Sequence, residues 1–291
     1  LASRIPYEWG VFLLSRLFSA TPLQSRLFHE AVERLRTIQT WIGRPIELNQ
    51  AVSRHLFANA AKDWRLLALG DLRWSRAKKM FTTKGQEILE RYRDQQPGVI
   101  LVNSHFGVAR TAGKMFYENG FPLTVISEAD DAALFANIEC KSLLTNELAP
   151  FQVIREASRE LEAGRSLYIS ADGSQGDAGI ELNFLGKSRP FRTGFAQLAI
   201  KTGAPVVPVF GTVNEHGFVH IQIHDPLDCG LDTQPKRDRI AFLVEQYARL
   251  LESYWIADPG NIREEQFLSH HNDYGIHTAR TIAREIRSRA A

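Results

Sequence analysis

Two different hydrophobic periods divide the chain. Over the first 95 residues, apolar side chains recur three and four positions apart, as in Leu23, Leu27 and Leu35, with charged residues between them. This spacing is typical of amphipathic helices. The last of these predicted helices is expected to end at Gly70, because glycine commonly terminates a helix. The N-terminal part is therefore predicted to be helical.

After residue 95 the period changes. Short apolar runs bounded by polar or turn residues alternate with stretches of helical pattern; the runs are 99–102, 123–126, 152–154, 166–169 and 206–210. Alternation of this kind predicts an α/β fold with a mixed, largely parallel sheet flanked by helices. Two extended runs around residues 215–217 predict a hairpin at the edge of that sheet.

No repeat, low-complexity segment or linker interrupts this pattern. We therefore expect a single domain over residues 1–291, with a helical N-terminal part over residues 1–95 and an α/β part over residues 96–291. A chain of this length is long enough to bury a full hydrophobic core.

Composition narrows the class of protein. Hydrophobic residues make up 44% of the chain and charged residues 23%, as in ordinary soluble globular proteins. The net charge of +2 gives no indication of a nucleic-acid partner. Cys140 and Cys229 have no metal-ligand spacing and form no disulfide framework, which favours a reducing compartment such as the cytoplasm. The charge-free run 202–214 is too short to cross a bilayer.

The first candidate for chemistry is His105, which follows the apolar run 99–102. In parallel α/β sheets, ligands bind at the carboxyl ends of the strands. An imidazole with an ordinary pKa of about 6.5 suits a general base near neutral pH. A histidine held by hydrogen bonds at a strand end gives the same pattern, so both readings stay open. Gly107 leaves room for close backbone approach.

The loop after the run 166–169 is the second candidate. It begins with Asp172 and Gly173 and contains two further glycines. Loops rich in backbone N–H groups can bind a phosphate or an oxyanion, although ordinary turns have the same composition. Glu128 and Asp130 lie beyond another strand, where they either line the same crevice or cap the next helix.

The third candidate is a basic cluster. Lys187, Arg189 and Arg192 stand just before a helix expected to begin near Gly194. Basic side chains beside a helix N-terminus suit an anionic group, and a solvated basic turn is the alternative. Histidines recur at positions 216, 220 and 224, but no Cys, Asp or Glu completes a metal site, so no metal is predicted.

Taken together, these segments resemble one family. "GVILVNSHFG", "YISADG", "FLGKSRPFRTGFAQLAIKTGAPVVPVF" and "GFVHIQIHDPL" stand in the order found in the lysophospholipid-acyltransferase-like superfamily. The chain is most similar to the bacterial late acyltransferases of lipid A biosynthesis, from about residue 81 to residue 261. The resemblance implies a glycerol-3-phosphate-acyltransferase-like fold.

The resemblance also implies an activity. An acyl group would pass from an acyl carrier protein or coenzyme A thioester to a hydroxyl or amine on a lipid or small-molecule acceptor, with His105 as general base. No metal or redox cofactor is implied, and no nucleic acid. The protein would act peripherally at the inner face of the bacterial inner membrane.

One position departs from the family. Its signature is a histidine, four residues, and an aspartate or glutamate, whereas the fifth residue after His105 is Arg110. A carboxylate from a neighbouring strand end would then assist His105, and the candidates are Asp172, Glu128 and Asp130. An amine acceptor, which needs less help from a base, is the alternative.

Arg110 would then hold a carboxylate or phosphate of the substrate through paired hydrogen bonds. The residues expected to bind substrate are thus Arg110, Gly107, Gly173, Arg189, Arg192 and Gly194.

Two other functions stay open. A catalytically degenerate protein of the same fold would bind an acyl chain, an acyl carrier protein or a membrane, as Arg110 favours and the intact His105 opposes. A thioesterase would use water as the acceptor. Separately, the apolar stripe of Trp9, Phe12 and Leu13 either lies in a bilayer interface or packs on the domain.

Overall fold

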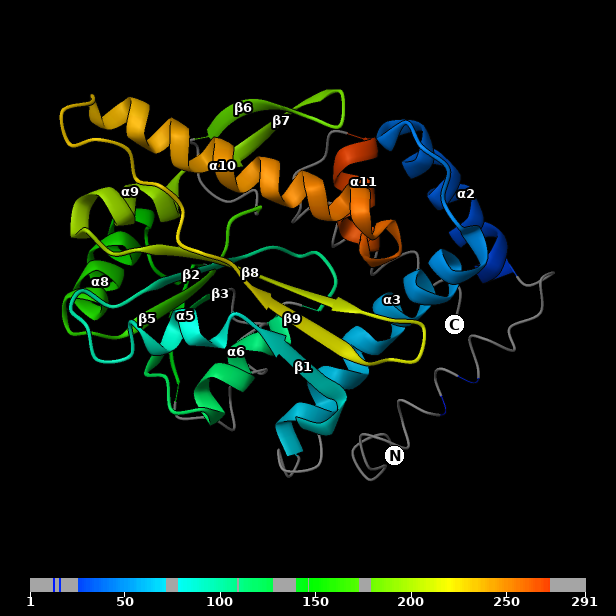
Figure 1. Ribbon diagram of the computed structural model, residues 1–291, viewed down its shortest axis with the longest axis horizontal. Coiled ribbons are helices and arrows are strands. Elements are labelled where there is room, and N and C mark those ends of the chain that lie inside the picture. Colours follow the sequence, from blue (N-terminus) through cyan, green and yellow to red (C-terminus); the bar gives the residue numbers. More distant parts are fainter. Residues whose placement is uncertain are drawn as a thin grey trace.

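The computed structural model describes residues 13, 16, 26–71, 78–108, 110–127, 140–145, 147–172 and 179–272. Within these ranges a seven-stranded sheet has the order β1-β9-β8-β2-β5-β3-β4 (Figure 1). Its strands are β1 (Phe81–Lys84), β2 (Ile100–Asn103), β3 (Leu123–Ser127), β4 (Lys141–Leu144), β5 (Ser166–Ser170), β8 (Val206–Val213) and β9 (Val219–Ile223). Neighbours pair in parallel, except β8 with β9. The predicted α/β class with a mixed, largely parallel sheet is confirmed.

Helices cover both faces of this sheet. One face packs against α8 (Pro150–Glu162), α9 (Gly194–Thr202) and α10 (Lys236–Ala257), and the other against α5 (Gln86–Glu90) and α6 (Arg110–Glu118) (Figure 1). In β2, Ile100 and Val102 join the first apolar cluster, and Leu101 joins the second. Because both faces are buried, the strand is a continuous apolar run rather than an alternating one.

The N-terminal helices pack against the C-terminal segment. α2 (Arg26–Ile42) and α3 (Leu48–Asp71) lie beside η3 (Pro259–Asn261), a 3₁₀ turn, and near α11 (Glu264–His271) (Figure 1). The buried face of α2 has the predicted helical spacing. The region up to residue 95 also contains the 3₁₀ turn η2 (Lys78–Met80) and strand β1, both of which the helical prediction lacks.

The prediction of a strand over residues 152–154 is wrong, because these residues lie in α8. Pro150 begins this helix, and the Gln152 side chain accepts a hydrogen bond from the Ala149 N–H at 2.9 Å. Three apolar residues are too few to distinguish a strand from a buried helix turn. The strand instead lies earlier, as β4, in a stretch whose pattern predicted a helix.

Two further strands were not predicted. β6 (Gly179–Phe184) and β7 (Lys187–Arg192) form a separate antiparallel hairpin, where the sequence pattern predicted a glycine-rich loop and a basic cluster before a helix, and no strand. The predicted hairpin over β8 and β9 is present, but it does not lie at the edge. β1 pairs with β9 and forms the edge itself, because an apolar strand left unpaired would expose its backbone groups.

In the part of the chain described here, no helix has both the length and the apolar composition needed to cross a membrane. The N-terminal apolar stripe, for which both a bilayer interface and packing on the domain stay open, lies outside the described residues except for Leu13, which is helical and exposed.

Candidate active site

Two adjacent strands place His105 beside Asp172. Asn103 ends β2 and Ser170 ends β5, and these two residues are partners in the parallel ladder. The Ser170 hydroxyl donates to Asn103 Oδ1 at 2.7 Å. His105 and Asp172 each follow two positions later, so equal lengths of chain bring the two side chains to the same point at the carboxyl edge of the sheet.

The Asp172 carboxylate accepts hydrogen bonds from three groups. His105 Nδ1 lies 2.8 Å from Oδ1, and the His105 backbone N–H lies 3.1 and 3.0 Å from the two oxygens. Gln266 Nε2 on α11 donates to Oδ2 at 2.8 Å. His105 is 4% exposed and Asp172 is 5% exposed. The pair is therefore buried and held by three separate segments of the chain.

The electrostatics determine which ring nitrogen carries the proton. Burial by itself raises the pKa of Asp172, but its interactions with His105 and the charge of Arg189 outweigh burial, and the pKa lies below its ordinary value. An ionised carboxylate only accepts hydrogen bonds, so Nδ1 must be the donor. The lone pair of the neutral ring then lies on Nε2, as a general base requires.

The backbone N–H groups of residues 105–108 all donate hydrogen bonds within the protein. The N–H of Phe106 donates to Ser104 Oγ at 3.0 Å, that of Gly107 to the carbonyl of Asn261 at 2.8 Å, and that of Val108 to the carbonyl of Gly211 at 2.8 Å. These bonds fix the loop that carries the imidazole.

Gly107 is required by its surroundings. Its φ is +52°, in the left-handed region, and a Cβ there would lie 2.2 Å from the Gly211 carbonyl oxygen. A larger residue would push the loop away from β8. Because its N–H is bonded to Asn261, Gly107 contributes here to the placement of His105; the predicted role in substrate binding stays a prediction.

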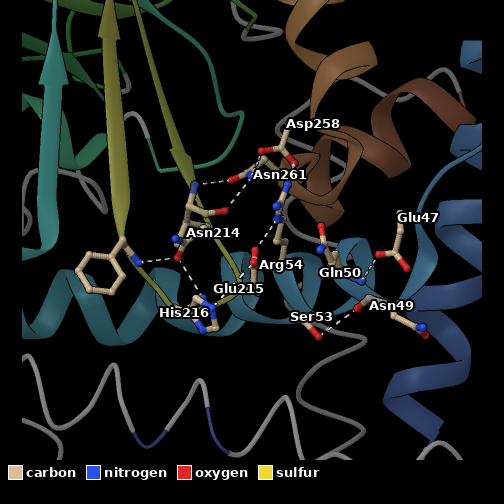
Figure 2. Close-up of polar contacts among 12 residues, drawn as sticks. Glu47, Asn49, Gln50, Ser53, Arg54, Asn214, Glu215, His216, Asp258 and Asn261 are labelled. Carbon is tan, nitrogen blue, oxygen red and sulfur yellow. Dashed lines mark hydrogen bonds and ion pairs between the residues drawn. The ribbon is translucent and has the colours of Figure 1, made fainter.

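A polar network anchors Asn261 from the other side (Figure 2). Its amide exchanges hydrogen bonds with the backbone of Val213 at 2.9 and 3.0 Å and donates to Asp258 at 2.8 Å. Arg54 on α3 pairs with Asp258 at 3.3 Å and with Glu215 at 2.9 Å (Figure 2). The network joins α3, the β8–β9 turn and the C-terminal segment behind the His105 loop.

Arg189 lies in the core rather than on a basic surface. It is 7% exposed, and its guanidinium lies over Phe184, Phe191 and Trp255 at 5.1, 5.4 and 5.4 Å from the ring centroids. Side chains alternate along a strand, and the buried positions of β7 include both Arg189 and Phe191. Arg189 therefore faces inward, where its charge acts on Asp172.

The other two predicted basic residues, Lys187 and Arg192, are not buried in the core as Arg189 is. The Lys187 ammonium donates to the carbonyls of His270 and His271, each at 3.2 Å. Arg192 ends β7 and is half-buried, and Gly194 begins α9 with open space around its Cα. Their predicted role in binding substrate stays a prediction.

Of the three carboxylates predicted near His105, the described contact is that of Asp172. Glu128 and Asp130 lie outside the described residues, as does Gly173. Arg110 is the first residue of α6, and its side chain lies outside what the structure describes.

Gln266, Asn261 and Tyr247 support the site and were not predicted. The Tyr247 hydroxyl, buried on α10, donates to the carbonyl of Asn103 at 2.7 Å. Residues 259–267 are buried despite their polar composition. Such a run normally indicates a solvated surface, so the sequence carries no local signal for this role.

Within the described ranges, no three His, Cys, Asp or Glu side chains gather in a way that could hold a metal ion. The absence of a metal cofactor stays a prediction.

Fold and site together define an α/β protein with a buried histidine–carboxylate pair at the carboxyl ends of two parallel strands. Residues 30–254 match the family model of the bacterial lipid A biosynthesis acyltransferases, and the chain belongs to this family. The resemblance in the sequence is thereby confirmed.

Curated relatives are phosphatidylinositol mannoside acyltransferases. The chain is 27% identical over 183 residues to that of Mycolicibacterium smegmatis, which covers 57% of this chain and 59% of the relative. It is 25% identical over 190 residues to that of Mycobacterium tuberculosis strain H37Rv, covering 59% of each chain. The chain thus spans less than two thirds of the length of these relatives.

Proposed function

We propose that the protein transfers a fatty acyl group from an acyl carrier protein or coenzyme A thioester to a hydroxyl or amine of a lipid acceptor. The observation that carries this proposal is the hydrogen-bonded pair of His105 and Asp172, 2.8 Å apart, in a member of an acyltransferase family. The names of the mycobacterial relatives favour a glycolipid as the acceptor.

In this reaction His105 Nε2 takes the proton from the acceptor as its oxygen or nitrogen attacks the thioester carbonyl. The new C–O or C–N bond forms, the C–S bond breaks, and the imidazolium returns its proton to the departing thiolate. Asp172 orients the ring and stabilises the imidazolium that forms transiently.

Asp172 would replace the carboxylate that the family signature has at the position of Arg110. A carboxylate assists a histidine through its distance and direction, wherever it lies in the sequence. Arg110, freed from that role, would bind a phosphate or carboxylate of one substrate. Because the acceptor is a lipid, we place the reaction at the inner surface of a bacterial membrane.

Thioester consumption tests this function directly. The protein is incubated with acyl-coenzyme A or acyl carrier protein donors, and with either phosphatidylinositol mannosides or a lipid A precursor as acceptor. Products are identified by mass. We expect an acylated lipid with wild type, and a rate lower by at least about 10³ with His105→Ala. His216→Ala, at an exposed turn, is the matched control.

Each alternative has its own result. An equal rate in His105→Ala and wild type contradicts the role of His105. Donor hydrolysis without an acylated lipid indicates a thioesterase. Donor binding without turnover indicates a degenerate binding protein, the function that Arg110 favours.

A further inference from the structure

The acyl transfer proposed above needs a hydrogen-bond donor that the pair of His105 and Asp172 does not supply. When an acceptor attacks a thioester, the carbonyl oxygen takes up a negative charge, and enzymes stabilise this charge with donors that are fixed in advance. The backbone N–H groups of residues 105–108 all donate hydrogen bonds within the protein. A donor from the described part of the chain would therefore come from a side chain.

Asn103 carries an unused donor of this kind. It ends β2, two residues before the candidate base, and it is 0% exposed. Its Nδ2 atom is buried and has no hydrogen-bond partner among the described residues. Buried polar groups are normally paired, because an unpaired donor costs free energy. A partner that is present only during the reaction would explain why this donor is retained beside the base.

Three hydrogen bonds hold Asn103 in place. The Ser170 hydroxyl donates to Oδ1 at 2.7 Å, so the oxygen of the amide faces Ser170. The backbone carbonyl of Asn103 accepts from the Tyr247 hydroxyl at 2.7 Å and from the Ala171 N–H at 2.9 Å. The side chain and the backbone are therefore both fixed before any substrate binds, as stabilisation of a transition state by a preorganised donor requires.

Asn103 and His105 lie on the same side of β2 and of the segment that continues it. Side chains alternate along an extended chain. Val102 and Phe106 both belong to the first apolar cluster, on the face covered by α8, α9 and α10. The residues at positions 103 and 105 alternate with these two and therefore lie on the opposite face.

The neighbouring strand repeats this arrangement. Ala171 belongs to the first apolar cluster, which leaves Ser170 and Asp172 on the opposite face. Two contacts thus follow each other along the carboxyl edge of the sheet: Asn103 with Ser170 at 2.7 Å, and His105 with Asp172 at 2.8 Å. Two residues of an extended strand span about 6.6 Å. A thioester carbonyl held beside the imidazole would therefore lie beside the amide as well.

We propose that Asn103 is a catalytic residue of acyl transfer, whose side-chain amide donates a hydrogen bond to the oxyanion formed at the thioester carbonyl. This inference rests on the proposed function of His105 as the general base. As the acceptor loses its proton to His105, its oxygen or nitrogen bonds to the carbonyl carbon. The π electrons of the C=O bond move to the oxygen, which accepts from Nδ2. When the C=O bond forms again, the C–S bond breaks and the imidazolium protonates the thiolate.

Steady-state kinetics with acyl-coenzyme A as the donor test this role. Asn103→Leu combined with Ser170→Ala removes the donor together with the hydroxyl that pairs with the amide oxygen. We expect kcat to fall by about 10² to 10³, the loss typical of one oxyanion donor, and KM to change less than about threefold. Ser170→Ala alone keeps Nδ2 and is the matched control, with an expected loss in kcat below about tenfold.

Stability and donor binding distinguish a catalytic role from a structural one. Replacing both partners of a buried hydrogen bond by apolar groups can leave a fold equally stable, and here an unpaired donor is removed as well. The double variant is therefore expected to unfold at a urea concentration no lower than wild type. A thioether analogue of acyl-coenzyme A, which lacks the carbonyl oxygen, is expected to bind both proteins equally. A loss of kcat together with weaker thioether binding and lower stability would overturn the proposal.

Two further results also count against it. A folded double variant with the wild-type kcat overturns the proposal, and so does one in which only KM rises. Asn103→Ala is the second variant, and the same loss of kcat is expected of it. If neither protein folds, Asn103 serves the fold alone and the catalytic role is rejected.

The rates of wild type and His105→Ala separate this inference from the proposed function. If wild type consumes no thioester, the proposed function fails and the role of Asn103 falls with it. If His105→Ala is inactive while the Asn103 variants keep the wild-type kcat, the role of Asn103 alone fails. If wild type only hydrolyses the donor, the same oxyanion forms, and hydrolysis is expected to slow by the same factor in the Asn103 variants.

Discussion

Asp172, which is buried, and Asp258, which is half-buried, have pKa values that move in opposite directions. The pKa of Asp172 is lowered and that of Asp258 is raised. For both, burial is the largest cause and favours the neutral acid. For Asp258, burial raises the pKa more than Arg54 and Asn261 lower it, although both residues donate hydrogen bonds to its carboxylate.

The difference lies in what each carboxylate faces. Asp172 accepts hydrogen bonds from two side chains and one backbone N–H, and the positive charge of Arg189 lowers its pKa further. Asp258 faces a partly exposed arginine at 3.3 Å and is repelled by the nearby Glu215. One region thus holds an ionised carboxylate against a histidine, and the other links three segments of the fold.

The largest expected effect is that of Asp172→Asn on catalysis. An amide cannot hold the His105 tautomer that a carboxylate selects, and the same change in a serine-protease triad lowers the rate by about 10⁴. We expect kcat/KM for acyl transfer to fall by about 10³ to 10⁴. Asp258→Asn is the matched control and is expected to lower it less than about threefold. Equal losses of kcat/KM in the two variants would contradict a special role of Asp172 in catalysis.

Gly107→Ala is expected to weaken the packing of the His105 loop against the Asn261–Asp258 network. The new methyl group would clash with the Gly211 carbonyl, and alanine would have to adopt the positive φ of Gly107. We expect a loss of about 2 to 4 kcal/mol in the free energy of unfolding. Urea denaturation measures this loss. Gly194→Ala, where a Cβ meets open space, is the control. A loss below about 0.5 kcal/mol would mean that the loop shifts freely.

Gln266→Met removes one donor from Asp172 and keeps the length of the side chain. A hydrogen bond to a charged group contributes about 1.5 to 3 kcal/mol. We expect kcat/KM to fall by about tenfold, with a smaller change in KM than in kcat. Gln246→Met on α10, whose amide bonds carbonyls away from the site, serves for comparison. A wild-type rate for Gln266→Met would show that two donors suffice.

The smallest effect concerns stability against pH. The folded pKa of Asp172 is depressed, so its contribution is present above the unfolded pKa of about 3.9 and is lost as pH falls through the folded value. The folded pKa of Asp258 is raised, so its contribution is present at acidic pH and is lost as pH rises.

At pH 7, Asp172→Asn is therefore expected to destabilise the fold by about 1 to 3 kcal/mol. Asp258→Asn is expected to stay within about 0.5 kcal/mol of wild type. Chemical denaturation at pH 7 and at about pH 2.5, below the unfolded pKa, measures both. The two variants should come closer in stability at the lower pH, and a constant difference would contradict the opposite shifts.

The fold class and the two members of the histidine–carboxylate pair are encoded locally. Apolar runs of four or five residues between helical stretches predict parallel strands, and His105 and Asp172 each follow such a run. The ladder that joins β2 to β5 then brings them together at one edge. Local patterns failed where a run was short, as in α8, and where polar and apolar residues alternate in a hairpin, as in β6 and β7.

The contact between His105 and Asp172 was decided by the tertiary structure, as was the burial of Arg189. His105 and Asp172 are 67 positions apart, and Gln266 lies 94 positions beyond Asp172. Hydrophobic periodicity extends only along one element and carries no information about which distant polar groups meet. The segment that contains Gln266 is polar, yet it is buried because its hydrogen-bond partners lie on other elements. The sequence alone thus determined the sheet and the place of His105 at the end of a strand, whereas the packing of distant segments determined what surrounds His105.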